Sequence, residues 1–162
     1  NRIWKGARKA LAEQLDHVAF LRTRIEQLDL FLDKDEVNEI WITFPDPFLR
    51  KSKANRRLTA PPFLDIYREI LIDRGILHLK TDSPEFYEFT LDSLNGYSGA
   101  VVLHSIEDIY GQSLVVPELA IKTYYERMHL AEGKTIKYVQ FRLDPPNGHT
   151  TYPVGNAANP VL

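Results

Sequence analysis

Short apolar runs alternate along the chain with segments whose apolar residues recur at helical spacing, and this alternation constrains the fold most. Runs of strand length occupy residues 17–22, 38–44, 75–82, 99–106 and 135–143. Strands that alternate with helices favour an α/β fold with a mostly parallel sheet and right-handed crossovers. The near-continuous apolar character of 38–44 predicts a strand buried on both faces.

The segments between these runs carry the start and stop signals of helices. Apolar residues on one face and basic residues on the other predict an amphipathic helix over 2–15. Prolines suit the first turn of a helix and glycine its end. By these signals and by periodicity, further helices are predicted over 24–32, 61–75, 83–94 and 123–133.

Composition narrows the classes of protein that this chain can belong to. The 162 residues fit one domain. They include no cysteine, so disulfides, thiolate metal ligands and a cysteine nucleophile are excluded. No apolar run reaches about 18 residues, which argues against a membrane span, and we expect a cytoplasmic location. The histidines show no metal-ligand spacing, so no metal site is predicted. His78 alternates with leucines and is predicted to be a core residue.

Polar residues collect directly after three of the predicted strands, in the stretches 22–24, 45–47 and 81–82. Ligands of doubly wound sheets bind outside the carboxyl ends of the strands, so a site is expected there. Asp46 lies between two prolines, which restrict the backbone and aim its carboxylate. Asp46 and Asp82, the acids of the second and third stretches, also have structural interpretations. Pro-Asp-Pro can be a strand-ending turn, and Asp82 can be a helix cap.

A cluster of positive charge follows Asp46, although the formal net charge of the chain is −2. We call residues 50–57 the basic segment, because five of its eight residues are Lys or Arg and none is acidic. Like charges repel, so such a segment is expected to extend until a polyanion neutralises it. Phe48, just before it, could pack against a base or a ribose. RNA is therefore a predicted partner, and a solvated surface is the alternative.

Three motifs in order carry a resemblance to a known family. They are Phe44-Pro45-Asp46-Pro47 with a basic run ending in Arg56-Arg57-Leu58, then Leu79-Lys80-Thr81-Asp82, then Thr123-Tyr124-Tyr125-Glu126. Together they resemble the bacterial tRNA (guanine-N7-)-methyltransferases, class I enzymes that use S-adenosylmethionine. The resemblance extends from about residue 2 to residue 143.

The resemblance implies a Rossmann-like class I methyltransferase sheet, mostly parallel, with one reversed strand at 135–143. The first strand or strands of that sheet, with the glycine-rich loop, would precede residue 1. A strand–helix–strand unit takes about 30 residues, so we expect the full-length protein to extend at least that far upstream. Residues 1–143 would then be a partial methyltransferase domain, inactive alone, and 144–162 an irregular C-terminal tail.

The function implied is transfer of a methyl group from S-adenosylmethionine to N7 of a guanine in the variable loop of tRNA. Asp46 would be catalytic and, with Arg24, would contact the cofactor. The implied substrate contacts are Arg50, Asp82, Thr123, Tyr124, Tyr125 and Glu126. The implied RNA contacts are Lys51, Ser52, Lys53, Ala54, Asn55, Arg56 and Arg57. Two alternatives stay open: a non-catalytic tRNA- or RNA-binding module on a degenerate methyltransferase scaffold, and a methyltransferase for another substrate.

Overall fold

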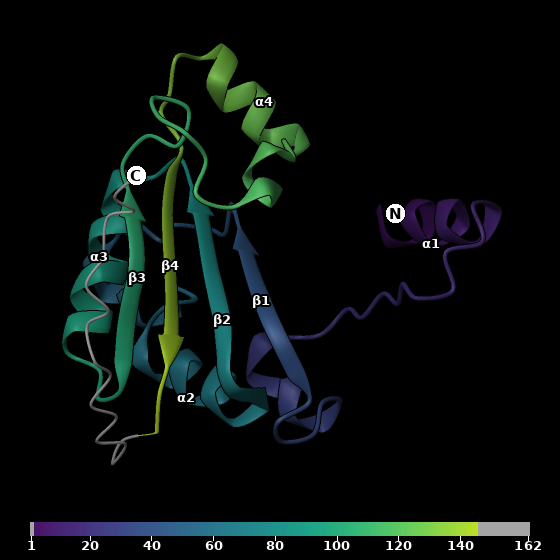
Figure 1. Ribbon diagram of the computed structural model, residues 1–162, viewed down its shortest axis with the longest axis horizontal. Coiled ribbons are helices and arrows are strands. Elements are labelled where there is room, and N and C mark those ends of the chain that lie inside the picture. The colour runs from purple at the N-terminus through teal and green to yellow at the C-terminus, as the bar shows by residue number, and fades with distance from the viewer. Residues whose placement is uncertain (1, 146–162) are drawn as a thin grey trace, which may run out of the picture.

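Residues 2–145 are described by the computed structural model, in which helices flank a four-stranded sheet (Figure 1). The predicted tail therefore lies, from residue 146 on, outside the described residues. The elements are α1 (Arg2–Ala12), η1 (Ile25–Leu30), β1 (Val37–Thr43), η2 (Lys51–Arg56), α2 (Pro61–Ile70), β2 (Leu71–Thr81), α3 (Pro84–Asn95), β3 (Ala100–Ile106), η3 (Pro117–Ala120), α4 (Tyr124–Ala131) and β4 (Lys137–Leu143), where η marks a 3₁₀ helix.

The strand order in the sheet is β1-β2-β4-β3. β1 and β2 are parallel, whereas β4 runs antiparallel to both of its neighbours, β2 and β3. Three strands therefore point the same way and one reversed strand lies between them, which confirms the predicted reversal near the C-terminus. The carboxyl ends of β1, β2 and β3 meet at one edge of the sheet, and α4 lies at this edge in Figure 1.

The main core lies between the sheet and the two helices α2 and α3. The prolines of α2 are in its first turn, as predicted, and the Ser83 side chain accepts a hydrogen bond from the Phe86 N–H at the start of α3. Burial of one apolar side chain in this core stabilises the fold by about 1.5–3 kcal/mol. A smaller cluster on the opposite face contains Ile109, Leu119, Ile136 and Tyr138. No helix within residues 2–145 is long and apolar enough to cross a membrane.

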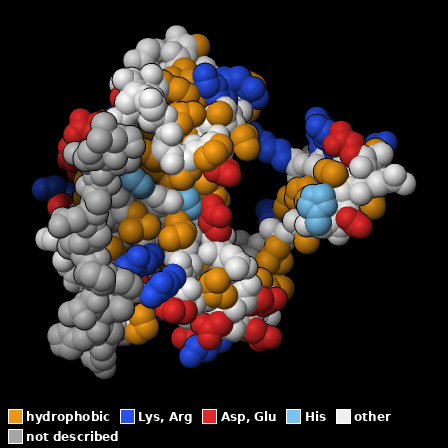
Figure 2. All heavy atoms as spheres, in the orientation of Figure 1, with side chains coloured by type: hydrophobic (Ala, Val, Ile, Leu, Met, Phe, Trp, Pro, Cys, Tyr) orange, Lys and Arg blue, Asp and Glu red, His pale blue; other side chains and the backbone are white. Residues whose placement is uncertain are grey.

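The prediction of a strand over 17–22 is wrong, because this stretch has no regular secondary structure. A strand needs partners for its backbone N–H and C=O groups. Each described strand pairs only with its neighbours in the sheet, and none of them pairs with this stretch. It instead connects α1, which lies apart from the sheet, to η1 (Figures 1 and 2).

Three further differences concern burial and boundaries. Only Ile42 of β1 is buried, because β1 is an edge strand of the described sheet, so the predicted burial on both faces is wrong. The segment predicted as helix 24–32 is a 3₁₀ helix with no buried residue. Helix α2 ends at Ile70, and β2 starts immediately after it, whereas the sequence suggested a helix up to Gly75.

Candidate active site

Asp46 and Asp82 follow neighbouring parallel strands and lie at the same edge of the sheet. The pairing of β1 with β2 continues one residue past β1, where the Phe44 N–H donates to the Lys80 carbonyl at 2.8 Å. Asp46 is exposed, and the Asp82 side chain is 23% exposed. The expectation that strand-end acids gather at one edge is therefore confirmed for these two residues.

The loop around Asp46 has an unusual backbone. Phe44 and Phe48 have φ angles of 49° and 40°, in the left-handed region that bulky residues rarely adopt. The Phe48 N–H donates to Asp46 Oδ1 at 3.2 Å, which stabilises this turn. Oδ2 of Asp46 has no hydrogen bond to any of the residues 2–145. One carboxylate oxygen thus shapes the loop, and the other is without a hydrogen-bond partner among the described residues.

Arg57 supports the same loop through two hydrogen bonds. Its Nε donates to the Pro47 carbonyl at 2.9 Å and its Nη2 to the Phe48 carbonyl at 3.2 Å. Its guanidinium carbon lies 4.5 Å from the centre of the Phe89 ring, and the residue is only 8% exposed. Arg57 was predicted to contact RNA, but the structure directs its charge inward to the Asp46 loop.

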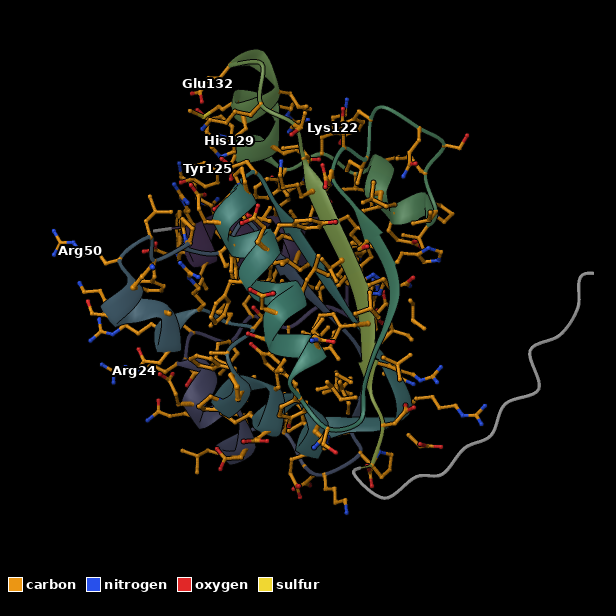
Figure 3. The ribbon with its side chains drawn as sticks, turned by 90° about the vertical axis from the view of Figure 1, so that its left-hand side faces the viewer. Arg24, Arg50, Lys122, Tyr125, His129 and Glu132 are labelled. Carbon is orange, nitrogen blue, oxygen red and sulfur yellow. The ribbon has the colours of Figure 1, made fainter. Side chains whose placement is uncertain are left out.

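The remaining cationic side chains of the basic segment are exposed. Lys51–Arg56 form the 3₁₀ helix η2, not the extended loop that the sequence suggested. Within the part of the chain described, Arg50, Lys51, Lys53 and Arg56 have no ion pair. Figure 3 shows Arg50 pointing away from the body of the molecule. Ser52 and Asn55 are also exposed, while Ala54 is half-buried.

Asp82 contacts two side chains, a histidine and a lysine, that the sequence did not reveal. His129 Nδ1 and Lys134 Nζ each lie 3.4 Å from Asp82 Oδ2. The hydrogen bond from Lys134 lowers the pKa of Glu132, which lies 3.0 Å from Lys134 Nζ. The His129 ring stacks on Phe44, with ring centres 5.9 Å apart. These two contacts hold the Asp82 carboxylate in place. Through the stacking of His129 on Phe44, α4 also contacts the loop that carries Asp46.

Glu126, the last residue of the Thr-Tyr-Tyr-Glu segment (residues 123–126), is fully buried. Glu126 is 0% exposed and forms an ion pair with Lys80 at 2.7 Å. It also accepts hydrogen bonds from the Tyr110 hydroxyl at 2.6 Å and the Thr123 N–H at 3.1 Å. Burial, together with this bond, raises the pKa of Tyr110. In this conformation Glu126 is closed off from solvent, so its contact with a substrate stays a prediction.

Thr123 and Glu126 form a capping box at the start of α4. The Glu126 N–H donates to Thr123 Oγ1 at 3.2 Å, reciprocating the bond from the Thr123 N–H. The spacing Thr-x-x-Glu was the sequence signal that could have shown this role. The two tyrosines between them are exposed by 68% for Tyr124 and 41% for Tyr125. Tyr125 is near α1, since Arg2 Nη2 donates to its hydroxyl at 2.6 Å.

Arg24 is exposed and does not reach the Asp82 network. It lines a pocket of about 480 Å³ together with Phe48 and Arg56. The structure thus brings the residue predicted to contact the cofactor together with a residue of the basic segment.

Comparison with known proteins shows which family the chain is similar to. The Methyltransf_4 family, described as "Putative methyltransferase", matches residues 1–139. The tRNA (guanine-N(7)-)-methyltransferase of Porphyromonas gingivalis is 48% identical over 150 residues, which cover 90% of this chain and 59% of that protein. Its counterpart in Christiangramia forsetii is 43% identical over 143 residues, or 88% of this chain and 63% of the relative.

The protein of the same name from Bacteroides fragilis is 43% identical, with 94% of this chain and 59% of the relative covered. The chain therefore spans 59–63% of the length of these three relatives. The match to the family covers the two strand-end acids, the basic segment and α4. This chain belongs to that family of methyltransferases.

Proposed function

We propose that the full-length protein transfers a methyl group from S-adenosylmethionine to N7 of a guanine in the variable loop of tRNA. The names of the relatives support the reaction. The structural observation that carries the proposal is the position of Asp46 and Asp82 at one sheet edge, next to exposed cationic side chains that have no acidic partner within residues 2–145.

The chemistry of guanine matches a site built on carboxylates. Guanine N7 already has an in-plane lone pair, so it attacks without losing a proton. Positive charge then develops on the imidazole portion of the base. A carboxylate that accepts hydrogen bonds from the N1–H and the exocyclic amine stabilises that charge. Asp46, with Oδ2 available, is suited to this role as an electrostatic and orienting residue.

Of the two residues expected to contact the methyl donor, Asp46 matches the charge of its sulfonium and Arg24 does not. When bound, S-adenosylmethionine supplies a methyl group on a positively charged sulfonium. The anionic charge of Asp46 is compatible with the sulfonium, while its free oxygen is assigned to the guanine. The exposed guanidinium of Arg24 carries the same sign of charge as the sulfonium, so it does not fit that end of the donor. The donor's carboxylate is the group that a guanidinium would bind, and the donor-affinity measurement described below tests that contact.

The basic segment and α4 would contribute alignment. Cationic side chains that bind the phosphates hold the tRNA while the base reaches the sheet edge. Correct positioning of two reactants supplies a large part of the rate in such transfers. The Asp82 network keeps its carboxylate in one place, because His129 and Lys134 both contact the same oxygen.

The test is nucleoside analysis of tRNA incubated with the full-length protein and S-adenosylmethionine. We expect 7-methylguanosine to appear, and to be absent when the variable-loop guanine of the tRNA is replaced by adenine. Formation of a different methylated nucleoside, or of none, would overturn the proposal. Binding of tRNA without any methylation would favour the non-catalytic module.

A further inference from the structure

The pocket beside Arg24 lies at the meeting point of two segments far apart in sequence. Thr23, Arg24 and Glu26 line it from the start of η1, and Phe48 and Arg56 line it from the Asp46 loop and η2. Its volume of about 480 Å³ falls within the range of sites for small ligands. Figure 3 shows Arg24 and Arg50 projecting toward the same side of the molecule.

The two guanidinium groups of this pocket are free of protein partners. Both Arg24 and Arg56 are exposed, and within residues 2–145 neither side chain has a hydrogen bond or an ion pair. One acid, Glu26, also lines the pocket, so the lining carries a net positive charge. Two guanidinium groups next to one cavity are suited to a phosphate, because each presents several N–H donors in a plane.

The apolar part of the lining is held firmly. Phe48 is half-buried at a φ of 40°, and its backbone is fixed on both sides: Asp46 accepts its N–H, and Arg57 donates to its carbonyl. Phe63, a buried residue of α2, lines the pocket as well. The backbone that carries the Phe48 ring is therefore held in place, and the half-buried ring lines the pocket, where an aromatic face can stack on a base.

We propose that this pocket binds one nucleotide of the RNA substrate, with its phosphate between Arg24 and Arg56 and its base or ribose against Phe48. The proposal rests on the proposed function, because it takes tRNA as the partner. It assigns Arg24 to RNA and not to the methyl donor. It also makes the pocket an extension of the basic segment, so that RNA contacts run from η2 to the start of η1.

The test uses the full-length protein with Arg24→Ala, Arg56→Ala and the double variant, and Arg22→Ala as a control. Arg22 is an exposed arginine two residues from Arg24 and does not line the pocket. Binding of tRNA is measured between about 50 and 200 mM salt. Each lost phosphate contact reduces the log–log salt slope by about 0.7–0.9. We expect this reduction for each single variant, about twice as much for the double variant, and less for Arg22→Ala.

Affinity for S-adenosylmethionine is measured on the same proteins. We expect it to be unchanged in Arg24→Ala. A weaker affinity for the donor with an unaltered tRNA slope would overturn the proposal and return Arg24 to the cofactor. Equal slopes for Arg22→Ala and Arg24→Ala would overturn it too, because the effect would then be general charge and not a site.

Phe48→Leu separates stacking from charge. Leucine keeps an apolar side chain but lacks the aromatic face, so tRNA binding should weaken about fivefold with no change in the salt slope. Unchanged affinity would remove Phe48 from the site. These readouts concern binding, whereas the proposed function is judged by 7-methylguanosine. An enzyme that methylates tRNA while its pocket variants bind normally would refute the pocket alone.

Discussion

The basic segment and the Thr-Tyr-Tyr-Glu segment both resemble ligand-contacting motifs, yet the structure treats their charges in opposite ways. Lys53 and Arg56 are exposed and have no ion pair among the described residues. Glu126 is completely buried and is bound to Lys80, Tyr110 and Thr123. Two segments that match family motifs can therefore differ completely in whether their charged side chains are accessible to a ligand.

The same contrast occurs between two adjacent residues. Arg56 lines the pocket with a free guanidinium, and Arg57 is buried with its guanidinium bonded to the Asp46 loop. The sequence does not distinguish the roles of these two residues, because both are arginines in one basic run. The difference is set by the direction in which each side chain leaves the end of η2.

The largest effect is expected at the buried ion pair. Glu126→Gln keeps the shape of the side chain but leaves the Lys80 ammonium buried without its counter-charge, which costs about 3–5 kcal/mol. Chemical denaturation of the full-length protein measures this as a lower free energy of unfolding. The double variant Glu126→Gln with Lys80→Met should recover most of the loss. A cost below about 1 kcal/mol would show that Glu126 is not an internal anchor.

A smaller loss of stability is expected for Arg57. Arg57→Met removes two hydrogen bonds from a charged donor, and we expect the free energy of unfolding to fall by about 2 kcal/mol. Methylation should fall as well, because the Asp46 loop loses its support, while the salt slope of tRNA binding stays the same. Arg56→Ala is the matched control and should show the reverse pattern. If both variants changed the slope equally, the distinction between the two arginines would be wrong.

The buried residue His78 provides a test that depends on pH. Burial lowers its pKa from the ordinary value of 6.5, although Glu39 acts in the opposite direction. Because the folded protein holds this proton less well than the unfolded chain, stability is present above 6.5 and is lost as pH falls below it. Denaturation between about pH 7 and pH 5 should therefore show a steeper decline for the wild type than for His78→Gln. Parallel declines would contradict this.

The smallest effect is expected at a single exposed cation. Lys53→Ala should leave the free energy of unfolding unchanged within about 0.5 kcal/mol, as is usual for surface substitutions. It should reduce the salt slope of tRNA binding by about 0.7–0.9 if Lys53 contacts one phosphate. A loss of stability with an unaltered slope would place Lys53 with Arg57 and Glu126 and not with Arg56.

The sequence predicted the elements whose signals are local. Helices α2, α3 and α4 follow from periodicity, prolines and caps, and β4 follows from its apolar run together with the family resemblance. The burial of His78 is confirmed as well: it is 3% exposed, and its Nδ1 lies 2.7 Å from the Tyr138 hydroxyl. These features depend on residues close in the chain or on simple alternation.

The failures depend on distant partners. Residues 17–22 have a strand-like sequence, but no described strand pairs with them. Lys80 follows alternating apolar residues, and only the fold shows that its counter-charge comes from α4. His129 and Lys134 reach Asp82 because α4 and the turn after it lie over the sheet edge, which no spacing in the sequence reveals.

The most direct test of the account is Asp46→Asn in the full-length protein. Asparagine keeps an oxygen that can accept the Phe48 N–H, so the turn is retained and only the charge is removed. With saturating tRNA and donor, we predict a fall in kcat of about a hundredfold or more, the usual effect of losing one preorganised electrostatic group. Affinity for tRNA should stay within about twofold. A kcat within a few-fold of the wild type would contradict the claim that this carboxylate acts on the guanine.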